Sequence, residues 1–131
     1  MRIVTPTSPA RRILVIDDDN FIRGLLEASL RASDFEVRGV ATQAAFGEEL
    51  VAFDPHVVMV DLDLGPGPSG MQLLALVEAD SPWVAKIMVT SHRSTRLVDG
   101  NAPAVPDVTY LVKADITSAD QIVAAVNASL E

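Results

Sequence analysis

The fold class is decided by the stretch VVMVDLDL, residues 57–64, in which four apolar residues are followed at once by carboxylates. A short apolar run bounded by polar residues is typical of a strand buried on both faces of a parallel sheet. A second run of this kind, Ile13–Ile16, ends in the three acids Asp17, Asp18 and Asp19. These stretches predict two buried strands whose carboxyl ends carry acidic side chains.

Around these two runs, β-rich segments alternate with segments in which apolar residues recur at helical spacing. This alternation predicts an α/β fold, a (βα)5 doubly wound five-stranded parallel sheet with right-handed crossovers. The predicted strands are Ile13–Ile16, Glu36–Val40, Val57–Val60, Ile87–Thr90 and Val108–Val112. Helical spacing is seen in Ile22, Leu25, Leu26 and Leu30, in Phe46, Leu50 and Phe53, in Leu73, Leu74 and Val77, and in Ile122, Val126 and Leu130.

Two segments carry weaker signals. Ser118 and Gln121 have the spacing of a capping box at the start of the last helix, and Thr117 with Asp120 offers an alternative register. Between the fourth and fifth strands, glycine, asparagine and prolines leave room for at most a short helix around Thr95–Asp99.

Composition limits the domain count and the classes of function. The chain has 131 residues, 49% of them hydrophobic, which predicts one globular domain over residues 12–131 after a flexible leader, residues 1–11. It has no cysteine, which excludes disulfides, thiolate metal sites and a cysteine nucleophile. A net charge of −8 disfavours nucleic-acid binding by this chain alone, although acidic surfaces are also common in soluble proteins. Its apolar runs are far shorter than the ~20 residues that span a bilayer, so we expect a soluble, cytoplasmic protein outside the membrane.

The acidic side chains are predicted to meet at one edge of the sheet. Ligands of such sheets bind outside the carboxyl ends of the strands, where both Asp17–Asp19 and Asp61–Asp63 emerge. Like charges held close together destabilise a fold unless a cation lies among them. Oxygen ligands without histidine or cysteine suit a hard ion, so we expect bound Mg²⁺, with Mn²⁺ as a substitute. For Asp19 the alternative is that it caps the following helix.

Two further strand ends complete a predicted phosphate site. The fourth strand ends in Thr90 and Ser91, and the fifth is followed by Lys113. A carboxylate could attack phosphorus while the metal and Lys113 neutralise the developing charge and the Thr90 hydroxyl holds one phosphoryl oxygen. Alone, a threonine at a strand end is more often a turn former and a lysine a solvated charge. The four strand ends taken together are specific.

These motifs resemble those of response-regulator receiver domains of two-component and phosphorelay signalling, over roughly Arg12 to Leu130. They are a hydrophobic strand ending in an acidic pair, a phosphoacceptor strand, a threonine strand and a lysine strand. The corresponding segments are Ile13–Asp18, Val57–Leu64, Ile87–Ser91 and Tyr110–Lys113.

The resemblance implies a flavodoxin-like receiver fold and a role for each site residue. Asp61 would be the phosphoacceptor, assisted by Thr90 and Lys113. The metal would be bound directly by Asp61 and by Asp18. Further metal contacts would come from Asp17, mainly through water, and from the backbone carbonyl of Asp63.

The resemblance also implies partners. A histidine kinase or histidine phosphotransfer protein would phosphorylate the domain, and the surface of the fourth helix, fifth strand and fifth helix would then change to control a downstream protein. Thr90 and Tyr110 would move inward in that switch, although Tyr110 could equally be an ordinary half-buried strand tyrosine. Since the chain stops after the last helix, we expect another protein to provide the output. We expect a monomer or weak homodimer that is not an enzyme.

Two places depart from the usual family pattern. Lys113 is followed by Ala114 and not by a proline with a cis bond, and a cis bond before alanine costs about 3 kcal/mol, so we expect a trans peptide and a differently shaped loop. The loop Leu64–Gly70 is longer and richer in glycine and proline than usual, and no Gly-Lys-Ser/Thr of a P-loop follows it. The resemblance places Asp63 and His92 beside the attacking water, where they would tune the phosphoryl lifetime. His92 could instead be a surface histidine.

Two other functions stay open at the level of sequence. Asp61-Leu62-Asp63 after a hydrophobic strand also fits the nucleophile motif of haloacid-dehalogenase-type phosphatases, but that motif usually lies near the N-terminus and no Gly-Asp cluster follows Lys113. A receiver-like interaction module that signals without phosphorylation is the other alternative, supported by the altered loop at Ala114. Turnover of a phosphate ester would favour the phosphatase, and Mg²⁺-dependent labelling by a phosphodonor would favour the switch.

Overall fold

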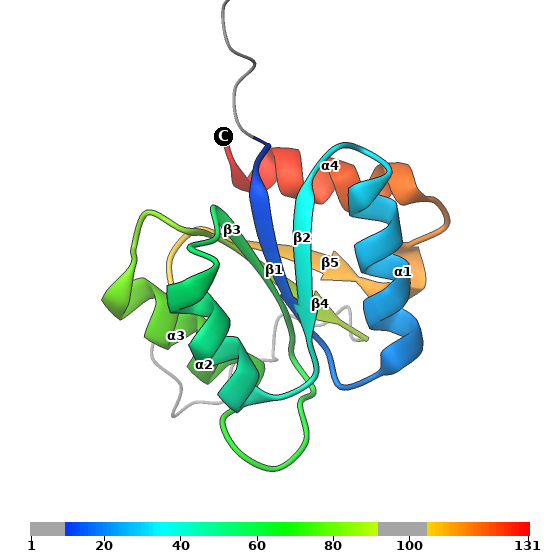
Figure 1. Cartoon of the computed structure of the whole chain (residues 1–131). Helices are drawn as coiled ribbons and strands as arrows, with labels where there is room; N and C mark the ends of the chain where they lie inside the picture. The colour runs from blue at the N-terminus through cyan, green and yellow to red at the C-terminus, as the bar shows by residue number, and fades with distance from the viewer. Residues whose placement is uncertain (1–9, 92–104) are drawn as a thin grey trace, which may run out of the picture.

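The computed structural model describes residues 10–91 and 105–131, and it contains a five-stranded parallel sheet in the order β2-β1-β3-β4-β5 (Figure 1). The predicted parallel sheet is therefore confirmed. The strands are β1 Arg12–Ile16, β2 Glu36–Val40, β3 Val57–Asp61, β4 Ala85–Thr90 and β5 Val108–Val112. The helices are α1 Asn20–Arg31, α2 Gln43–Ala52, α3 Gly70–Asp80, the short 3₁₀ helix η2 Lys113–Asp115 and α4 Ala119–Ser129.

Three strands are longer than predicted. β1 begins at Arg12, β4 begins at Ala85 and β3 extends to Asp61. Asp61 is included because it pairs with Val89 of β4, a contact that the pattern of one strand alone does not reveal. The predicted helix around Thr95–Asp99, His92 and residues 1–9 of the predicted leader lie outside the described residues.

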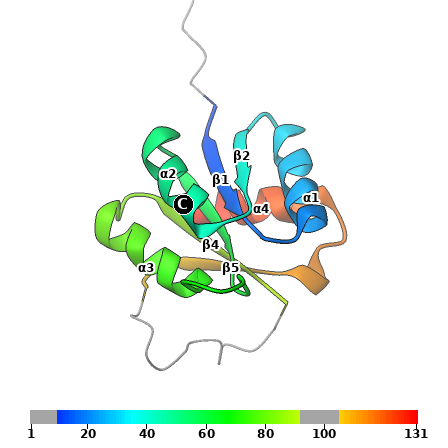
Figure 2. The ribbon, with the colours of Figure 1, turned by 60° about the horizontal axis from the view of Figure 1, so that its bottom comes forward.

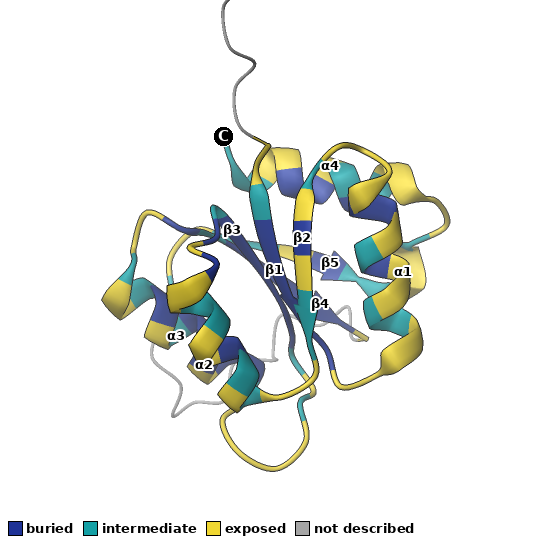
Figure 3. Ribbon diagram, in the orientation of Figure 1, coloured by how far each residue is buried: buried dark blue, intermediate teal, exposed yellow. Residues whose placement is uncertain are grey.

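Helices cover both faces of the sheet. α1 and α4 lie side by side on one face, and α2 and α3 cover the other (Figure 1, Figure 2). Because successive side chains of a strand point to opposite faces, Ile13 and Val15 pack in the core under α1 and α4, whereas Leu14 and Ile16 pack under α2 and α3. Figure 3 shows β3 buried along its length and the outer helix surfaces exposed. Across the described ranges, no helix combines the length and apolar character needed to cross a membrane.

The start of α4 follows the predicted capping box. Ser118 is the N-cap residue, and its backbone N–H donates a hydrogen bond of 3.1 Å to Oε1 of Gln121. The alternative register, with Thr117 as the cap, is wrong. A second capping box, which the sequence analysis did not identify, joins Ser69 and Gln72 at the start of α3.

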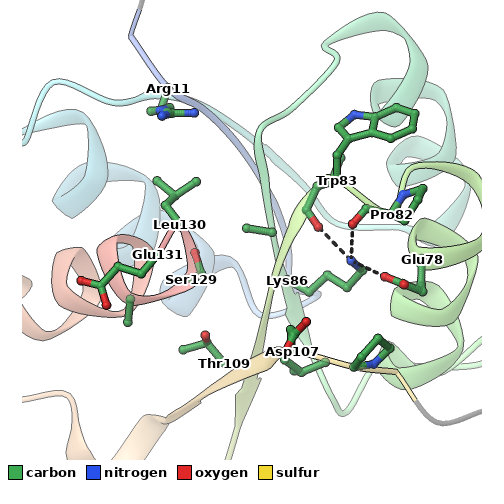
Figure 4. Close-up of a pocket in the computed structure, with 15 residues that line it drawn as sticks. Arg11, Glu78, Pro82, Trp83, Lys86, Asp107, Thr109, Ser129, Leu130 and Glu131 are labelled. Atoms are coloured by element: carbon green, nitrogen blue, oxygen red, sulfur yellow. Dashed lines mark hydrogen bonds and ion pairs between the residues drawn. The ribbon is translucent and has the colours of Figure 1, made fainter.

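A cavity of about 600 Å³ lies at the amino-terminal ends of β4 and β5, at the opposite end of the strands from the predicted site (Figure 4). Its wall includes Lys86, which is buried. Nζ of Lys86 donates to the carbonyl oxygen of Val84 at 2.8 Å and lies 2.7 Å from Oε2 of Glu78. A buried ammonium needs such partners, so Lys86 holds the end of α3 against β4.

Candidate functional site

The carboxyl ends of β1 and β3 bring two aspartates together. Ile16 pairs with Val60, so Asp17 and Asp61 follow at neighbouring positions of adjacent strands. One carboxylate oxygen each from Asp17, Asp18 and Asp61 lies within 4.8 Å of the others. The structure thus brings these three predicted site residues to one edge of the sheet.

Lys113 adds a positive charge to the three carboxylates. It directly follows β5, and its Nζ lies 3.3 Å from Oδ1 of Asp61 and 3.5 Å from Oδ2 of Asp17. Asp61 and Asp17 are buried, with 3% and 0% of their surface exposed, whereas Asp18 is exposed. One ammonium therefore faces two buried carboxylates, and it cannot balance both.

This imbalance perturbs the ionisation of the site. Burial and, second, repulsion by the neighbouring Asp17 raise the pKa of Asp61 from 3.8 to about 6, against the opposing effects of Lys113 and of the backbone N–H of Asp63. For Lys113, burial opposes the charged form, but the attraction of Asp61 and Asp17 outweighs it and the pKa of the ammonium is raised. Burial thus acts on the two groups in opposite directions, and the negative charge of Asp17 raises the pKa of both.

The donor set fits a divalent cation. Oδ2 of Asp17 is buried and accepts no hydrogen bond, although Lys113 lies near it. Octahedral Mg²⁺ binds oxygen at ~2.1 Å, so its opposite ligands lie ~4.2 Å apart. Neighbouring ligands of such an ion lie ~3.0 Å apart, so the three carboxylate oxygens, which lie within 4.8 Å of one another, would have to draw closer together to bind one ion. Metal binding by the backbone carbonyl of Asp63 stays a prediction.

Asp19 has a different role from the other two acids of its group. Its Oδ1 accepts hydrogen bonds from the backbone N–H groups of Phe21, at 2.8 Å, and Ile22, at 3.1 Å, and so caps α1. The capping alternative for Asp19 is confirmed. The backbone N–H of Asp19 donates to Oδ1 of Asp17 at 2.9 Å, which orients that carboxylate.

Thr90 and Tyr110 occupy the predicted strands. Thr90 ends β4, is 1% exposed, and follows Val89, the residue that pairs with Asp61. It therefore lies at the same edge as the acids. Tyr110 of β5 is 49% exposed, which fits both an ordinary strand tyrosine and an aromatic switch residue, so its switch role stays a prediction.

The segment after Lys113 follows the expected departure. No peptide bond among the described residues is cis, so the bond between Lys113 and Ala114 is trans, as predicted. The chain enters η2 at Lys113, and the backbone N–H of Ile116 donates to the carbonyl oxygen of Lys113 at 3.2 Å. With a trans bond before Ala114, the Lys113 ammonium still contacts Asp61, so a proline at position 114 is not required for that contact.

One residue of the site was missed by the sequence analysis. Nη1 of Arg23 donates to the carbonyl oxygen of Asp17 at 2.8 Å, and Nη2 donates to Oδ1 of Asn20 at 2.6 Å. Nε of Arg23 lies 3.6 Å from Oε1 of Glu27. Asn20 lies three residues before Arg23, and Glu27 lies four residues after it. On a helix this spacing places both side chains beside the Arg23 guanidinium, so the sequence did contain a signal for these contacts.

Curated relatives share this domain within longer proteins. The chain is 34% identical over 100 residues to a protein-glutamate methylesterase/protein-glutamine glutaminase 2 of Rhodopseudomonas palustris, which covers 74% of this chain and 27% of that protein. It is 32% identical over 120 residues to the transcriptional regulatory protein FixJ of Azorhizobium caulinodans, covering 88% of this chain and 53% of that protein. The chain spans about half the length of these relatives or less.

Solved structures and a family profile agree with the fold. A response regulator receiver domain protein from Methanospirillum hungatei superposes with a TM-score of 0.78 at 25% identity, covering 92% of this chain and 94% of the other. A receiver domain protein from Clostridium thermocellum gives 0.77 at 24% identity with the same coverage. The family profile described as response regulator receiver domain matches residues 13–127, a range that contains the acidic group and Lys113. The chain belongs to the response regulator receiver domain family.

Proposed function

We propose that this domain is a phosphoacceptor switch in which Asp61 takes a phosphoryl group from a phosphohistidine of a kinase or phosphotransfer protein. The observation that carries the proposal is the position of Lys113 Nζ, 3.3 Å from Asp61 and 3.5 Å from Asp17. The acidic group also fits Mg²⁺. These are the charges that a transferred phosphoryl group requires around it.

The chemistry needs little covalent work from the protein. A carboxylate oxygen of Asp61 attacks phosphorus, and the new P–O bond forms as the P–N bond to the donor imidazole breaks. The imidazole then takes up a proton from solvent. With a pKa of about 6, Asp61 is mostly ionised at neutral pH and can act as the nucleophile.

The groups around Asp61 stabilise the negative charge of the phosphoryl oxygens. Asp17, Asp18, Asp61 and the backbone carbonyl of Asp63 would hold Mg²⁺, which would supply positive charge to the phosphoryl oxygens. The ammonium of Lys113 contacts a second phosphoryl oxygen, and the hydroxyl of Thr90 turns to a third.

A change at Thr90 can reach the outer surface of the domain through the residues that pair with β4. Val89, the preceding residue, pairs with Leu111 of β5, so movement of Thr90 toward the phosphoryl group acts on the strand that carries Tyr110. We infer that the exposed surface of β5 and α4 changes its affinity for a downstream protein. We place this exchange in the cytoplasm.

Phosphorylation is tested by intact-mass analysis after incubation with acetyl phosphate, with and without Mg²⁺. The wild-type domain is expected to gain one phosphoryl group only with Mg²⁺, and Asp61→Asn none. Glu48→Gln, on the exposed surface of α2, is the control and should be labelled as the wild type is, because it removes a carboxylate that lies outside the site. Undiminished labelling of Asp61→Asn would refute the role of Asp61.

The same experiment separates the alternatives. Membership of the receiver family disfavours the phosphatase alternative. Continuous turnover of a phosphate ester would be the evidence in its favour. Absence of labelling in the wild type at saturating Mg²⁺ would favour an interaction module that works without phosphorylation.

A further inference from the structure

The loop between β3 and α3, residues 62–69, is held in its middle by one side chain of α2. Nε2 of Gln43 donates hydrogen bonds to the carbonyl oxygens of Pro66, at 3.3 Å, and Pro68, at 3.2 Å. Within the described part of the chain, these are the only hydrogen bonds that reach residues 64–68. Figure 1 shows this loop beside the start of α2, at the end of the sheet where the strands terminate.

The composition of the loop explains why an external donor is needed. Pro66 and Pro68 have no backbone N–H, so they cannot donate hydrogen bonds that would close the loop on itself. Gly67, between them, has φ of +112°, a conformation that favours glycine. A Cβ at Gly67 would lie 3.3 Å from Nε2 of Gln43, so the backbone passes close against that amide.

Both ends of the loop are anchored at the acidic site. The backbone N–H of Leu62 donates to the carbonyl oxygen of Val89 at 2.9 Å, directly after Asp61. At the other end, the backbone of Gly70 is packed so tightly against Asp61 and Leu62 that a Cβ there would lie 2.9 Å from Cα of Leu62. Between these anchors the loop passes the metal site, since a Cβ at Gly65 would lie 3.8 Å from Oδ2 of Asp18.

We propose that Gln43 is a positioning residue for the metal and phosphoryl site. Its two hydrogen bonds hold the loop near Asp18 before a cation binds. Less of the loop backbone therefore has to become ordered when the cation binds. The inference rests on the proposed function. It assigns a positioning role to a residue of α2, whereas the other residues of the site lie at the ends of strands. Loss of a group that hydrogen-bonds to a metal ligand and orients it weakens metal affinity by roughly 10–100-fold. Because Gln43 acts on the loop and not on a ligand, we expect about ten-fold, or about 1.4 kcal/mol.

The test compares two variants of α2. Gln43→Met keeps the length and neutrality of the side chain but removes the donor. Thr42→Ala is the matched control, because the Thr42 hydroxyl oxygen accepts from the backbone N–H of Ala45 at 3.2 Å and caps the same helix, and its hydroxyl makes no hydrogen bond to the described loop. Mg²⁺ affinity is measured by titration calorimetry, and the backbone order parameters of Gly65 and Gly67 are measured by ¹⁵N relaxation without Mg²⁺.

Gln43→Met is expected to raise the Kd for Mg²⁺ about ten-fold and to lower the order parameters of Gly65 and Gly67, whereas Thr42→Ala leaves the Kd within two-fold and the order parameters unchanged. A Kd for Gln43→Met within two-fold of wild type overturns the proposal, as does an equal weakening in Thr42→Ala. If the wild type binds Mg²⁺ and is phosphorylated while Gln43→Met behaves identically, this inference alone fails. If the wild type binds no Mg²⁺ or takes no phosphoryl group, the proposed function fails and takes this inference with it.

Discussion

Replacing Asp61 by asparagine should make the Mg²⁺-free domain more stable. Asp61 is 3% exposed, and its pKa rises from 3.8 to about 6, chiefly through burial and then through repulsion by Asp17. The folded state therefore binds more protons at this group than the unfolded state between pH 3.8 and about 6. The free energy of unfolding thus falls as the pH rises through that window, and the ionised carboxylate destabilises the fold at neutral pH.

The size of the effect follows from the shift. A rise of about two pH units, at about 1.4 kcal/mol for each, corresponds to about 3 kcal/mol at pH 7.5. Asparagine has nearly the same shape without the charge, so Asp61→Asn should recover about that free energy. With an unfolding entropy of about 2.1 cal/mol/K for each of the 131 residues, the melting temperature should rise by about 10 °C.

The assay is urea and thermal unfolding in buffer treated with a chelator, at pH 7.5 and at pH 5. At pH 5 the wild-type carboxylate is largely protonated, so the advantage of Asp61→Asn should shrink to about half. Glu48→Gln, on the exposed surface of α2, is the charge-matched control and should change the free energy of unfolding by less than about 0.5 kcal/mol. Saturating Mg²⁺ should stabilise the wild type and not Asp61→Asn. An Asp61→Asn variant no more stable than wild type at pH 7.5 would refute the reasoning.

Three further predictions concern the surroundings of the site and the opposite edge of the sheet. The pKa of His56 lies below 6.5, through burial and the nearby Arg12 and Arg11, so its contribution to stability should be complete above pH 6.5 and decline as the pH falls below it; an NMR titration giving a pKa of 6.5 or more would contradict this. Gly70→Ala should lower the free energy of unfolding by about 1–3 kcal/mol, because its Cβ would press on the backbone of Asp61 and Leu62, and labelling by acetyl phosphate should slow. Asp19→Ala should cost about 1 kcal/mol by removing the cap of α1 while leaving labelling of Asp61 intact, measured by urea unfolding and intact mass.

The sequence predicted the sheet well because three of its five strands, β1, β3 and β4, are buried on both faces. Runs such as Val57–Val60 contain no polar residue, which is typical of a parallel strand buried on both faces. The strand ends that carry Asp17, Asp61 and Lys113 were predicted for the same reason, since parallel strands bring their carboxyl ends to one edge. Local patterns were also sufficient for Ser118, whose partner lies three residues away.

Contacts between distant segments could not be predicted in the same way. Asp61 belongs to β3 because of its pairing with Val89, and Gln43 reaches the carbonyl of Pro66 across 23 positions of sequence. Neither contact leaves a periodic signal, because each depends on where two separate segments lie after folding. Lys86 was missed since an isolated lysine at a strand start usually points to solvent, whereas here Glu78 and backbone carbonyls surround its ammonium.

The unfavourable ionisation of Asp61 cannot by itself drive a switch between two folded conformers. The raised pKa of Asp61 compares the folded with the unfolded chain, whereas a modification shifts a conformational equilibrium only by the difference in its interactions with the two conformers. Phosphorylation also adds negative charge beside the buried Asp17. Moving a population from one part in a hundred to ninety-nine in a hundred needs about 5.5 kcal/mol. New contacts of the phosphoryl group with Lys113 and Thr90 would have to supply that free energy, so a variant that loses the Thr90 hydroxyl should still bind cation and accept phosphate while its outer surface changes only in part.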